Sequence, residues 1–520
     1  MTAVILDSEL FGHLAKYISQ IITHYFWTVK YSYLSSQEVA MPSLNRTLYI
    51  GTFIHTPILS ELVILHNTII GVDCDGKIAL IERDLPEHII SYPARIKAFV
   101  GTKHLWDPET TTCIRAGLIS TTESTNFFFP GFIDTHTHAP QYPNNGLLGS
   151  STLLSWLHTY TFPLESSFSS LARARTVYTR IVARTLRNGT TFAAYHATIH
   201  VPATTLLASI CFARGQRALV GRVCMDRLSP EDYRDESTES AVRDTEKVIK
   251  YVRGIDPGGE IVRPAITPRF AVSCSRGCLE ALGRLHGSTG VWAQTHIGES
   301  VEEVGAVRGL FPEARDYASV YDGTGLLTER TILAHAVHLT EGEVELIGMR
   351  GAKVSHCPVS NTCLTSGPAK VRGLLDKRIA VGLGTDMSGG YSPSILEAAR
   401  QAILVSRHVA LVDGDTAKLS VEEVLYLATK GGAKVIGLED KIGSFELGMD
   451  WDAQMICLGG VPKVPDDDGE EVDTGPVDIF GWESWPDRVA KWLYSGDDRN
   501  VQAVWVKGRL AHSRKPNPFA

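Results

Sequence analysis

Short runs of apolar residues alternate with longer amphipathic stretches through the middle of the chain. Eight of these runs predict buried strands, at residues 132–136, 191–196, 218–224, 261–267, 291–296, 331–335, 352–356 and 380–384. Stretches of helical length separate them, and residues 239–252 are an example, with Ala241, Val248 and Val252 among charged residues. Alternation of strand and helix predicts a parallel (β/α)8 TIM-like barrel, in the α/β class. A doubly wound open sheet is the alternative fold.

The two flanks of this region follow a different pattern. Before it, short strand-like runs occur at 62–66, 68–73 and 77–82, with no strong helix among them. After it, the runs at 451–457 and 501–506 have the same character. Ser420 to Glu423 form a capping box that opens the last clear helix before this tail. We expect residues 41–128 and 445–520 to form one small β-sandwich domain beside a barrel of residues 129–444.

The first 40 residues need a separate interpretation. The stretch from position 10 to 34 is apolar and aromatic, but His13, Lys16, His24 and Lys30 interrupt it. No uninterrupted run reaches the length of a membrane span, and the basic start of a signal peptide is missing. We expect residues 1–40 to be an N-terminal extension, and we expect no membrane attachment.

Composition narrows the class of protein. The chain has 520 residues, 44% hydrophobic and 21% charged, which is typical of a soluble globular protein of more than one ordinary domain. Its net charge of −8 argues against a nucleic-acid binder, which would carry a basic stripe. The nine cysteines include no CxxC pair and are typical of a reducing compartment. We therefore expect a cytoplasmic protein.

Polar residues stand at the ends of four predicted strands. His136 and His138 end the first strand, and residues i and i+2 of a strand point to the same face. His296 ends the fifth strand, His335 the sixth, and Asp386 follows the eighth. Catalytic residues of such barrels lie at the carboxyl ends of the strands, and imidazole is the commonest metal ligand. Each residue alone could be an ordinary buried polar group, but together they predict a metal site.

Other histidines receive a more ordinary interpretation. His356 ends the seventh strand and is a candidate for a supporting position behind the ligands. His158, His200 and His338 are expected to play no part in the site.

Several motifs carry a resemblance to a known family. They are residues 130–141 (PGFIDTHTHAPQ), 156–162 (WLHTYTF), 267–273 (TPRFAVS), 295–299 (THIGE), 382–391 (GLGTDMSGGY) and 493–500 (LYSGDDRN). With them the chain resembles the amidohydrolase superfamily and, more closely, the guanine deaminase family, from about Met41 to the C-terminal region. The metal pattern marks only the superfamily, whereas the TPRF block and the tail block are similar to guanine deaminases.

The resemblance implies an activity and a set of site residues. It implies zinc-dependent hydrolysis of guanine to xanthine and ammonia, in purine catabolism or salvage, by a cytoplasmic homodimer with one zinc per chain. The implied metal ligands are His136, His138, His296 and Asp386. The implied catalytic residues are Glu299, His335 and Asp386, and the implied substrate-binding residues are His138, Gln141, Arg269, Phe270, His296, Glu299 and Asp386. Val359 lies in the loop after the predicted seventh strand, where the family often has asparagine. This departure leaves any role of that loop in substrate specificity in doubt.

The chemistry of these residue types agrees with the implied roles. Three histidines and an aspartate leave a coordination position for water, although iron or cobalt would also suit them. The predicted fourth strand, 261–267, contains no lysine to bridge two metals, which favours one. Glu299, expected one helical turn past His296, could move protons, and Arg269 offers a fork of donors for a carbonyl oxygen. Phe270 offers a stacking face and Gln141 both a donor and an acceptor.

Two other functions remain open from the sequence. A single-metal amidohydrolase that deaminates or dechlorinates another heterocycle would share the metal set and differ in its pocket. A non-catalytic scaffold on the same barrel would be expected to lose ligands, and here the full set is present.

Overall fold

A computed structural model describes residues 44–104, 106–107, 109–115, 125–147, 152–459 and 475–515. The predicted extension, residues 1–40, lies outside the described residues. None of the helices in the described part is long and apolar enough to cross a bilayer.

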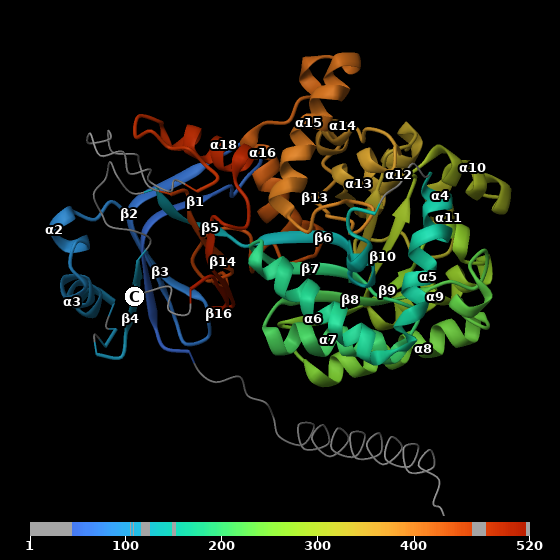
Figure 1. Ribbon diagram of the computed structural model, residues 1–520, viewed down its shortest axis with the longest axis horizontal. Helices are drawn as coiled ribbons and strands as arrows, with labels where there is room; N and C mark the ends of the chain where they lie inside the picture. The colour runs from blue at the N-terminus through green and yellow to red at the C-terminus, as the bar shows by residue number, and fades with distance from the viewer. Residues whose placement is uncertain are drawn as a thin grey trace, which may run out of the picture. The chain divides into compact units, whose positions relative to one another are not determined.

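The middle of the chain forms a parallel eight-stranded sheet whose strands pair in chain order (Figure 1). The strands are β6 (Phe132–His138), β7 (Thr190–His196), β8 (Arg217–Cys224), β9 (Val262–Pro268), β10 (Trp292–Ile297), β11 (Thr331–His335), β12 (Lys353–His356) and β13 (Val381–Leu383). All eight predicted strands are present. The barrel is thus confirmed, and strict chain order excludes the doubly wound alternative, in which the order reverses at a switch point.

Helices connect these strands and cover the outside of the barrel, as α6, α7 and α8 do in Figure 1. The longer ones are α6 (Leu171–Arg187), α7 (Val201–Arg214), α8 (Thr238–Ile255), α9 (Arg276–Thr289), α10 (Val301–Leu310), α12 (Glu341–Arg350) and α15 (Ile395–Asp413). Helix α8 contains the amphipathic stretch expected from the sequence: Ala241, Val248 and Val252 are buried, and Ser237 and Ser240 form a capping box at its start. Burial of one apolar stripe fixes each helix against the strands.

Shorter helices complete the barrel. They are α4 (Leu153–Trp156), α5 (Phe162–Ser166), α11 (Tyr317–Gly323), α13 (Pro358–Cys363), α14 (Val371–Asp376), α16 (Val421–Tyr426) and α17 (Gly432–Val435). Between α4 and α5 the chain makes a π-helical turn, η2 (Leu157–Thr161). The predicted capping box is confirmed at the start of α16, where the Ser420 hydroxyl accepts from the Glu423 amide.

The ring closes between its first and last strands through a seam of specific contacts. The carboxylate of Asp134 on β6 accepts from the backbone amide and the hydroxyl of Thr385, at 3.1 and 2.5 Å. The Asp386 amide donates to the His136 carbonyl over 3.0 Å. Gly384 permits this approach, because an added Cβ would lie 2.9 Å from that carbonyl oxygen. The seam therefore brings Asp386 beside His136.

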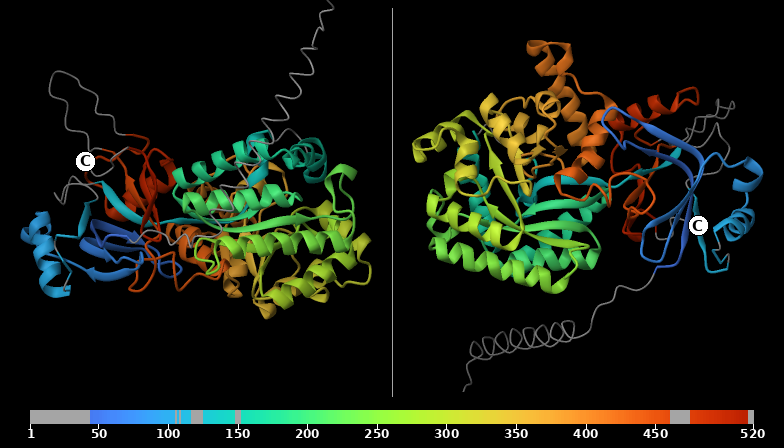
Figure 2. Two further views of the ribbon diagram at one scale, coloured as in Figure 1. Left: turned by 90° about the horizontal axis from the view of Figure 1, so that it is seen from below. Right: turned by 180° about the vertical axis from the view of Figure 1, so that it is seen from behind.

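Strands from the two flanks form a second, eight-stranded sheet. They are β1 (Thr47–His55), β2 (Val63–Val72), β3 (Ile78–Glu82), β4 (Thr112–Arg115), β5 (Asn126–Pro130), β14 (Ala453–Cys457), β15 (Val501–Val506) and β16 (Arg509–Ser513). Hydrogen bonds join them in the order β16-β15-β14-β5-β1-β2-β3, with β4 on β1. Figure 2 shows the blue N-terminal and red C-terminal strands side by side in both views. The two flanks share one core that includes Tyr49, Phe53, Phe128, Trp451 and Trp505.

The expectation of no strong helix in the first flank is wrong. Helices α2 (Glu87–Ile90) and α3 (Pro93–His104) cover a further core, which includes Leu48 and Ile50 of β1. Helix α3 buries only Ile96 and Val100, so its apolar stripe is too narrow to show as a helical period in the sequence. The last helix, α18 (Trp485–Ser495), lies in the tail.

A buried ion-pair cluster joins the barrel to the tail. Arg217 at the start of β8 donates to Asp452 over 2.8 Å from Nε and 3.0 Å from Nη2, and to Asp450 over 2.8 Å from Nη2. The three side chains are at most 2% exposed. This cluster lies at the end of the barrel strands opposite to the ends that carry His136, His296 and His335.

Candidate active site

Five predicted residues meet at the carboxyl ends of the barrel strands. His136 and His138 lie at the end of β6, two residues apart, so their side chains point to the same face of the strand. His296 lies near the end of β10, His335 ends β11, and Asp386 follows β13. All five are buried, none more than 8% exposed. One ligand atom from each of His136, His296, His335 and Asp386 lies within 4.8 Å of the others.

His138 belongs to the same cluster. Its Nε2 lies 3.1 Å from Nε2 of His296 and 3.4 Å from Oδ1 of Asp386. Nε2 of His136 lies 3.2 Å from the same Asp386 oxygen. The four predicted ligands and His335 therefore form one group of five residues, in which four histidines surround Asp386.

The protonation of two rings is set by their outer partners. Nδ1 of His296 lies 2.5 Å from the Arg269 carbonyl, which can only accept, so this nitrogen carries the proton and Nε2 offers a lone pair. Nδ1 of His335 lies 2.8 Å from Oδ1 of Asn361, which assigns the same tautomer there. A hydrogen bond of this kind fixes the orientation of a metal-ligating imidazole.

The electrostatics of the cluster also favour a cation. Burial lowers the pKa of His136, His138 and His296, which keeps the imidazoles neutral as a metal requires. Burial alone would raise the pKa of Asp386, but the adjacent His136, 3.2 Å away, and the neighbouring imidazoles hold that pKa well below its usual range. Within the described residues, Nε2 of His136 and of His335 has no hydrogen-bond partner although both atoms are buried. Buried donor atoms with no partner, arranged around an anionic carboxylate, fit a bound metal ion.

Glu299 reaches the cluster, but from a different local structure than expected. Strand β10 ends at Ile297 and α10 begins only at Val301, so Glu299 lies in a turn and not one helical turn past His296. Gly298, with φ of 56°, makes this sharp turn possible. Oε2 of Glu299 then lies 3.4 Å from Nε2 of His335. Burial raises the pKa of Glu299 well above its usual value, and the charge of Asp386 adds to this.

A pocket opens directly onto this cluster. It contains every residue predicted to bind substrate, and its wall consists of His138, Gln141, Leu153, Trp156, Leu157, Arg269, Phe270, His296, Glu299, Leu364 and Asp386. Helix α4 and the π-helical turn supply Leu153, Trp156 and Leu157 to the apolar part of this wall. Because π-helical turns often occur at functional sites, the irregular geometry of this wall agrees with the placement of the pocket.

The structure adds partners to the two predicted polar recognition residues. Arg269 was expected to direct its donors at a substrate, but Nη1 and Nη2 both donate to Glu165, over 2.5 and 3.3 Å. Nε2 of Gln141 donates to the same carboxylate over 2.8 Å. Since a guanidinium has five N–H groups and an amide has two, each residue keeps donors for a ligand.

Three residues of this region were missed by the sequence analysis. His196 ends β7, and its ring centroid lies 4.6 Å from that of His136 and 4.8 Å from that of His138. Its position at the end of a predicted strand was the signal that could have revealed it. Glu165 gave no signal, because it does not follow a predicted strand. Asn361 lies in the loop after the predicted seventh strand, 352–356, but its pattern did not indicate a contact with His335.

The remaining histidines lie apart from the pocket wall. His200 bonds Thr198, His338 lies 2.6 Å from the Ser366 carbonyl, and His158 packs on Phe162, as expected of ordinary residues. His356 lines a different cavity, between α14 and α15. Val359 is buried in α13, two residues before Asn361.

Comparison with known proteins agrees with the fold and the site. Residues 127–511 match the model of the amidohydrolase family. The chain belongs to the amidohydrolase family.

Several relatives at 37–46% identity are guanine deaminases. A probable guanine deaminase of Schizosaccharomyces pombe is 46% identical over 464 residues, which cover 89% of this chain and 83% of that protein. The guanine deaminase of Homo sapiens is 37% identical, with 90% of this chain and 97% of that protein covered. Among solved structures, guanine deaminase from C. acetobutylicum with guanine bound in the active site superposes with a TM-score of 0.77 at 32% identity, covering 90% of this chain and all of that one.

Proposed function

We propose that this chain is a guanine deaminase, which hydrolyses guanine to xanthine and ammonia. The observation that carries the proposal is the pocket, which joins all seven predicted substrate-binding residues to the His and Asp cluster. The identity of the relatives supports it, as does the solved relative with guanine in its active site.

We propose further that His136, His138, His296 and Asp386 hold one zinc ion. Imidazole nitrogens and a carboxylate oxygen are ligands that zinc accepts, and the neutral rings and anionic aspartate described above suit it. When bound, zinc would lower the pKa of a coordinated water towards neutrality and so make hydroxide available at pH 7. His335, whose Nε2 faces Asp386 at 3.8 Å, is the fifth donor of the cluster and is assigned to catalysis.

Glu299 is the proposed proton carrier. Deamination adds the oxygen of water to C2 of guanine and breaks the bond from C2 to the exocyclic nitrogen. The proton that water loses must reach the ring and then the leaving amine, which departs as ammonia. A buried carboxyl with a raised pKa holds a proton more readily than an exposed one, and Glu299 is such a group beside the cluster. His335 and Asp386 lie where they can hydrogen-bond the attacking oxygen.

Substrate recognition is assigned to three residues of the wall. Arg269 donates to the carbonyl oxygen at C6 of guanine, Gln141 bonds the purine edge, and Phe270 contacts the ring face. Adenine would present an amine to the guanidinium and leave its donors unpaired in a buried pocket. A site built to hydrogen-bond one group can reject an analogue that lacks it by about 10⁴–10⁵.

A substrate panel with metal analysis tests the proposal. kcat/KM is measured for guanine, adenine, cytosine and an aminotriazine on one preparation, with ammonia as the readout. Guanine should exceed the others by a wide margin, and zinc should be present at one ion per chain. If another heterocycle is the best substrate, the chain is the alternative kind of single-metal amidohydrolase and the guanine assignment is wrong.

Two expectations that follow from the family resemblance and the cysteine usage stay predictions. They are the homodimer and the cytoplasmic location. All nine cysteines carry free thiols in the structure.

A further inference from the structure

The carboxylate of Glu165 accepts hydrogen bonds from both polar recognition residues, Gln141 and Arg269. Glu165 in α5 is fully buried and does not belong to the pocket wall. Its Oε1 accepts from Nε2 of Gln141 and Nη2 of Arg269, and its Oε2 accepts from Nη1 of Arg269 over 2.5 Å and from the hydroxyl of Tyr233 over 2.8 Å. Four donors on two oxygens mean that Glu165 acts only as an acceptor.

This acceptor decides which way the Gln141 amide points. Because the carboxylate cannot donate, the NH₂ group of Gln141 must face it. The amide oxygen of Gln141 is thereby turned to the backbone N–H of Ser388, which donates to it over 3.2 Å. Glu165 and the Ser388 N–H therefore fix the same orientation of the Gln141 amide from its two polar atoms, and replacing the carboxylate by a group that can also donate removes one of these two constraints.

The same carboxylate fixes the Arg269 guanidinium in position and in charge. The two Nη atoms form a fork on Glu165, and the guanidinium carbon lies 5.3 Å from the centroid of the Phe162 ring. Arg269 is fully enclosed, and an unpaired buried cation would be costly. Glu165 therefore makes it possible for a guanidinium to stand in the pocket with its remaining N–H groups unpaired and available.

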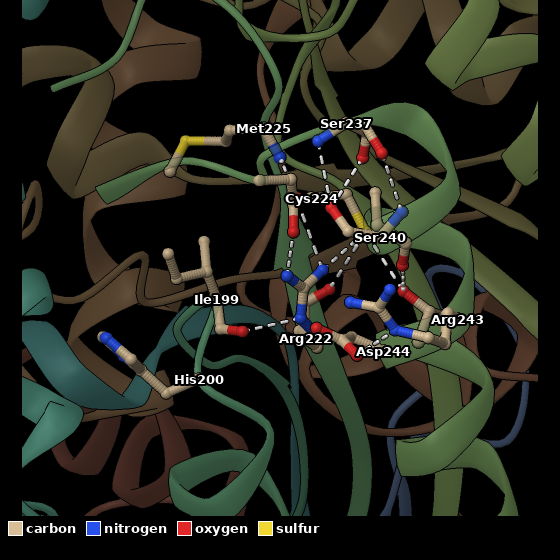
Figure 3. A network of polar contacts seen from close by, with 12 residues as sticks. Ile199, His200, Arg222, Cys224, Met225, Ser237, Ser240, Arg243 and Asp244 are labelled. Carbon is tan, nitrogen blue, oxygen red and sulfur yellow. Dashed lines mark hydrogen bonds and ion pairs between the residues drawn. The ribbon is translucent and has the colours of Figure 1, made fainter. Parts of the chain in front are cut away.

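The fourth donor, Tyr233, is itself held by an anchored loop. Asp235 accepts from Arg222 of β8 and from the Met225 amide over 3.0 Å. Figure 3 shows Arg222 directed at the Ile199 carbonyl, with which it bonds over 2.6 Å. This network holds the loop between β8 and α8 in place, and with it the Tyr233 hydroxyl that donates to Glu165.

We propose that Glu165 is a positioning residue that sets the specificity of the pocket for a purine with a carbonyl oxygen at C6. It acts through Arg269 and Gln141 and touches no substrate itself. The inference rests on the proposed function and names the residue that gives the pocket its fixed pattern of donors and acceptors.

The test compares Glu165→Gln with a matched control, Asp452→Asn. Both changes neutralise a buried carboxylate paired with a buried arginine, but Asp452 lies at the opposite end of the barrel strands. Binding of hypoxanthine and of purine, which differ at C6, is measured by calorimetry on the full chain, alongside kcat and KM for guanine. The ratio of the two dissociation constants reports recognition of the C6 oxygen without any need for turnover.

The expected result is specific to Glu165. Glu165→Gln should reduce the preference for hypoxanthine over purine by at least about tenfold and raise KM for guanine more than it lowers kcat, because ground-state binding is lost. Asp452→Asn should lower the melting temperature and leave the preference as in the wild type. Zinc content should be the same in all three proteins.

Other outcomes overturn the inference. A Glu165→Gln protein that binds the two ligands with the wild-type ratio would show that Glu165 is only structural. If that variant does not fold, Tyr233→Phe removes one of the four donors, and an unchanged ratio there would have the same meaning. A wild-type chain that prefers hypoxanthine but does not hydrolyse guanine would contradict the proposed function and leave the positioning role standing. A wild type with no preference would contradict both.

Discussion

Replacing Arg217 by methionine should destabilise the protein strongly, because it removes the cation that pairs with the buried carboxylate of Asp452. Asp450 and Asp452 are each 1% exposed and accept three hydrogen bonds of 2.8 to 3.0 Å from Arg217, but Asp450 also accepts from Lys77 over 3.0 Å and keeps that cation in the variant. Breaking a buried pair from one side costs about 3–5 kcal/mol. The entropy of unfolding is near 2.1 cal/mol/K per residue. For a unit of about 480 residues, the free energy of unfolding therefore falls by about 1 kcal/mol per degree near the melting temperature. The melting temperature should therefore fall by about 3–5 °C.

Circular dichroism at one scan rate measures this shift, at pH 7.5 and at pH 5. Burial raises the pKa of Asp452 while Arg217 opposes the rise, so removing Arg217 should raise that pKa further. Protonation at pH 5 then relieves part of the repulsion, and the difference between variant and wild type should shrink. Adding Asp452→Asn should recover stability for the same reason.

A surface pair serves as the control. Arg350 is half exposed and bonds Asp322, so Arg350→Met should change the melting temperature by no more than about 1 °C, as surface ion pairs contribute about 0–1 kcal/mol. If Arg217→Met melted within 1 °C of the wild type, or if the added asparagine made it less stable, the reasoning about the unpaired charge of Asp452 would be refuted.

Three further predictions concern the site and acid stability. His136→Ala should lose bound zinc and activity together, measured by metal analysis and ammonia release; full activity after exhaustive chelation would contradict the proposed role of the metal. Glu299→Gln should keep zinc and the melting temperature but lower kcat by about 10²–10⁴ or more, and near-normal turnover would refute the proton-carrier role. Glu260→Gln should lower stability at pH 7 by less than about 1 kcal/mol, since this glutamate is partly exposed. Lys507 and Lys441 hold the pKa of Glu260 at about 2 against burial, so its contribution is present above pH 4.5 and disappears as the pH falls towards 2. The difference in melting temperature should therefore vanish in acid, and a difference that grows in acid would contradict this account.

The barrel could be predicted because its strands differ sharply from their surroundings. Runs such as β11 are apolar between Thr331 and the polar residue at their end, His335, so each run indicates both a strand and a site position. Helix α3 could not be predicted, since only two of its side chains are buried and its sequence shows no apolar stripe.

The site was predictable where it depends on strand ends and not where it depends on packing between distant segments. His136, His138 and His296 follow from the local pattern. Glu165 lies 104 residues from Arg269 in the sequence, and nothing near it indicates that a carboxylate in a short helix is buried. Asn361 reaches His335 in the same way, through the placement of α13, which the sequence alone does not specify.

The seam between β6 and β13 ties the site to the order of folding. Asp134 and Thr385 are separated by 251 positions, so their contact carries a large loop-closure entropy and cannot form before the six intervening strands are in place. Since Asp386 follows Thr385, the cluster around His136 assembles only when the ring closes. A partly folded chain would then have no complete metal site. A metal ion that binds only the closed barrel would stabilise the contact between β6 and β13, and it would slow the separation of these two strands more than that of any other strand pair.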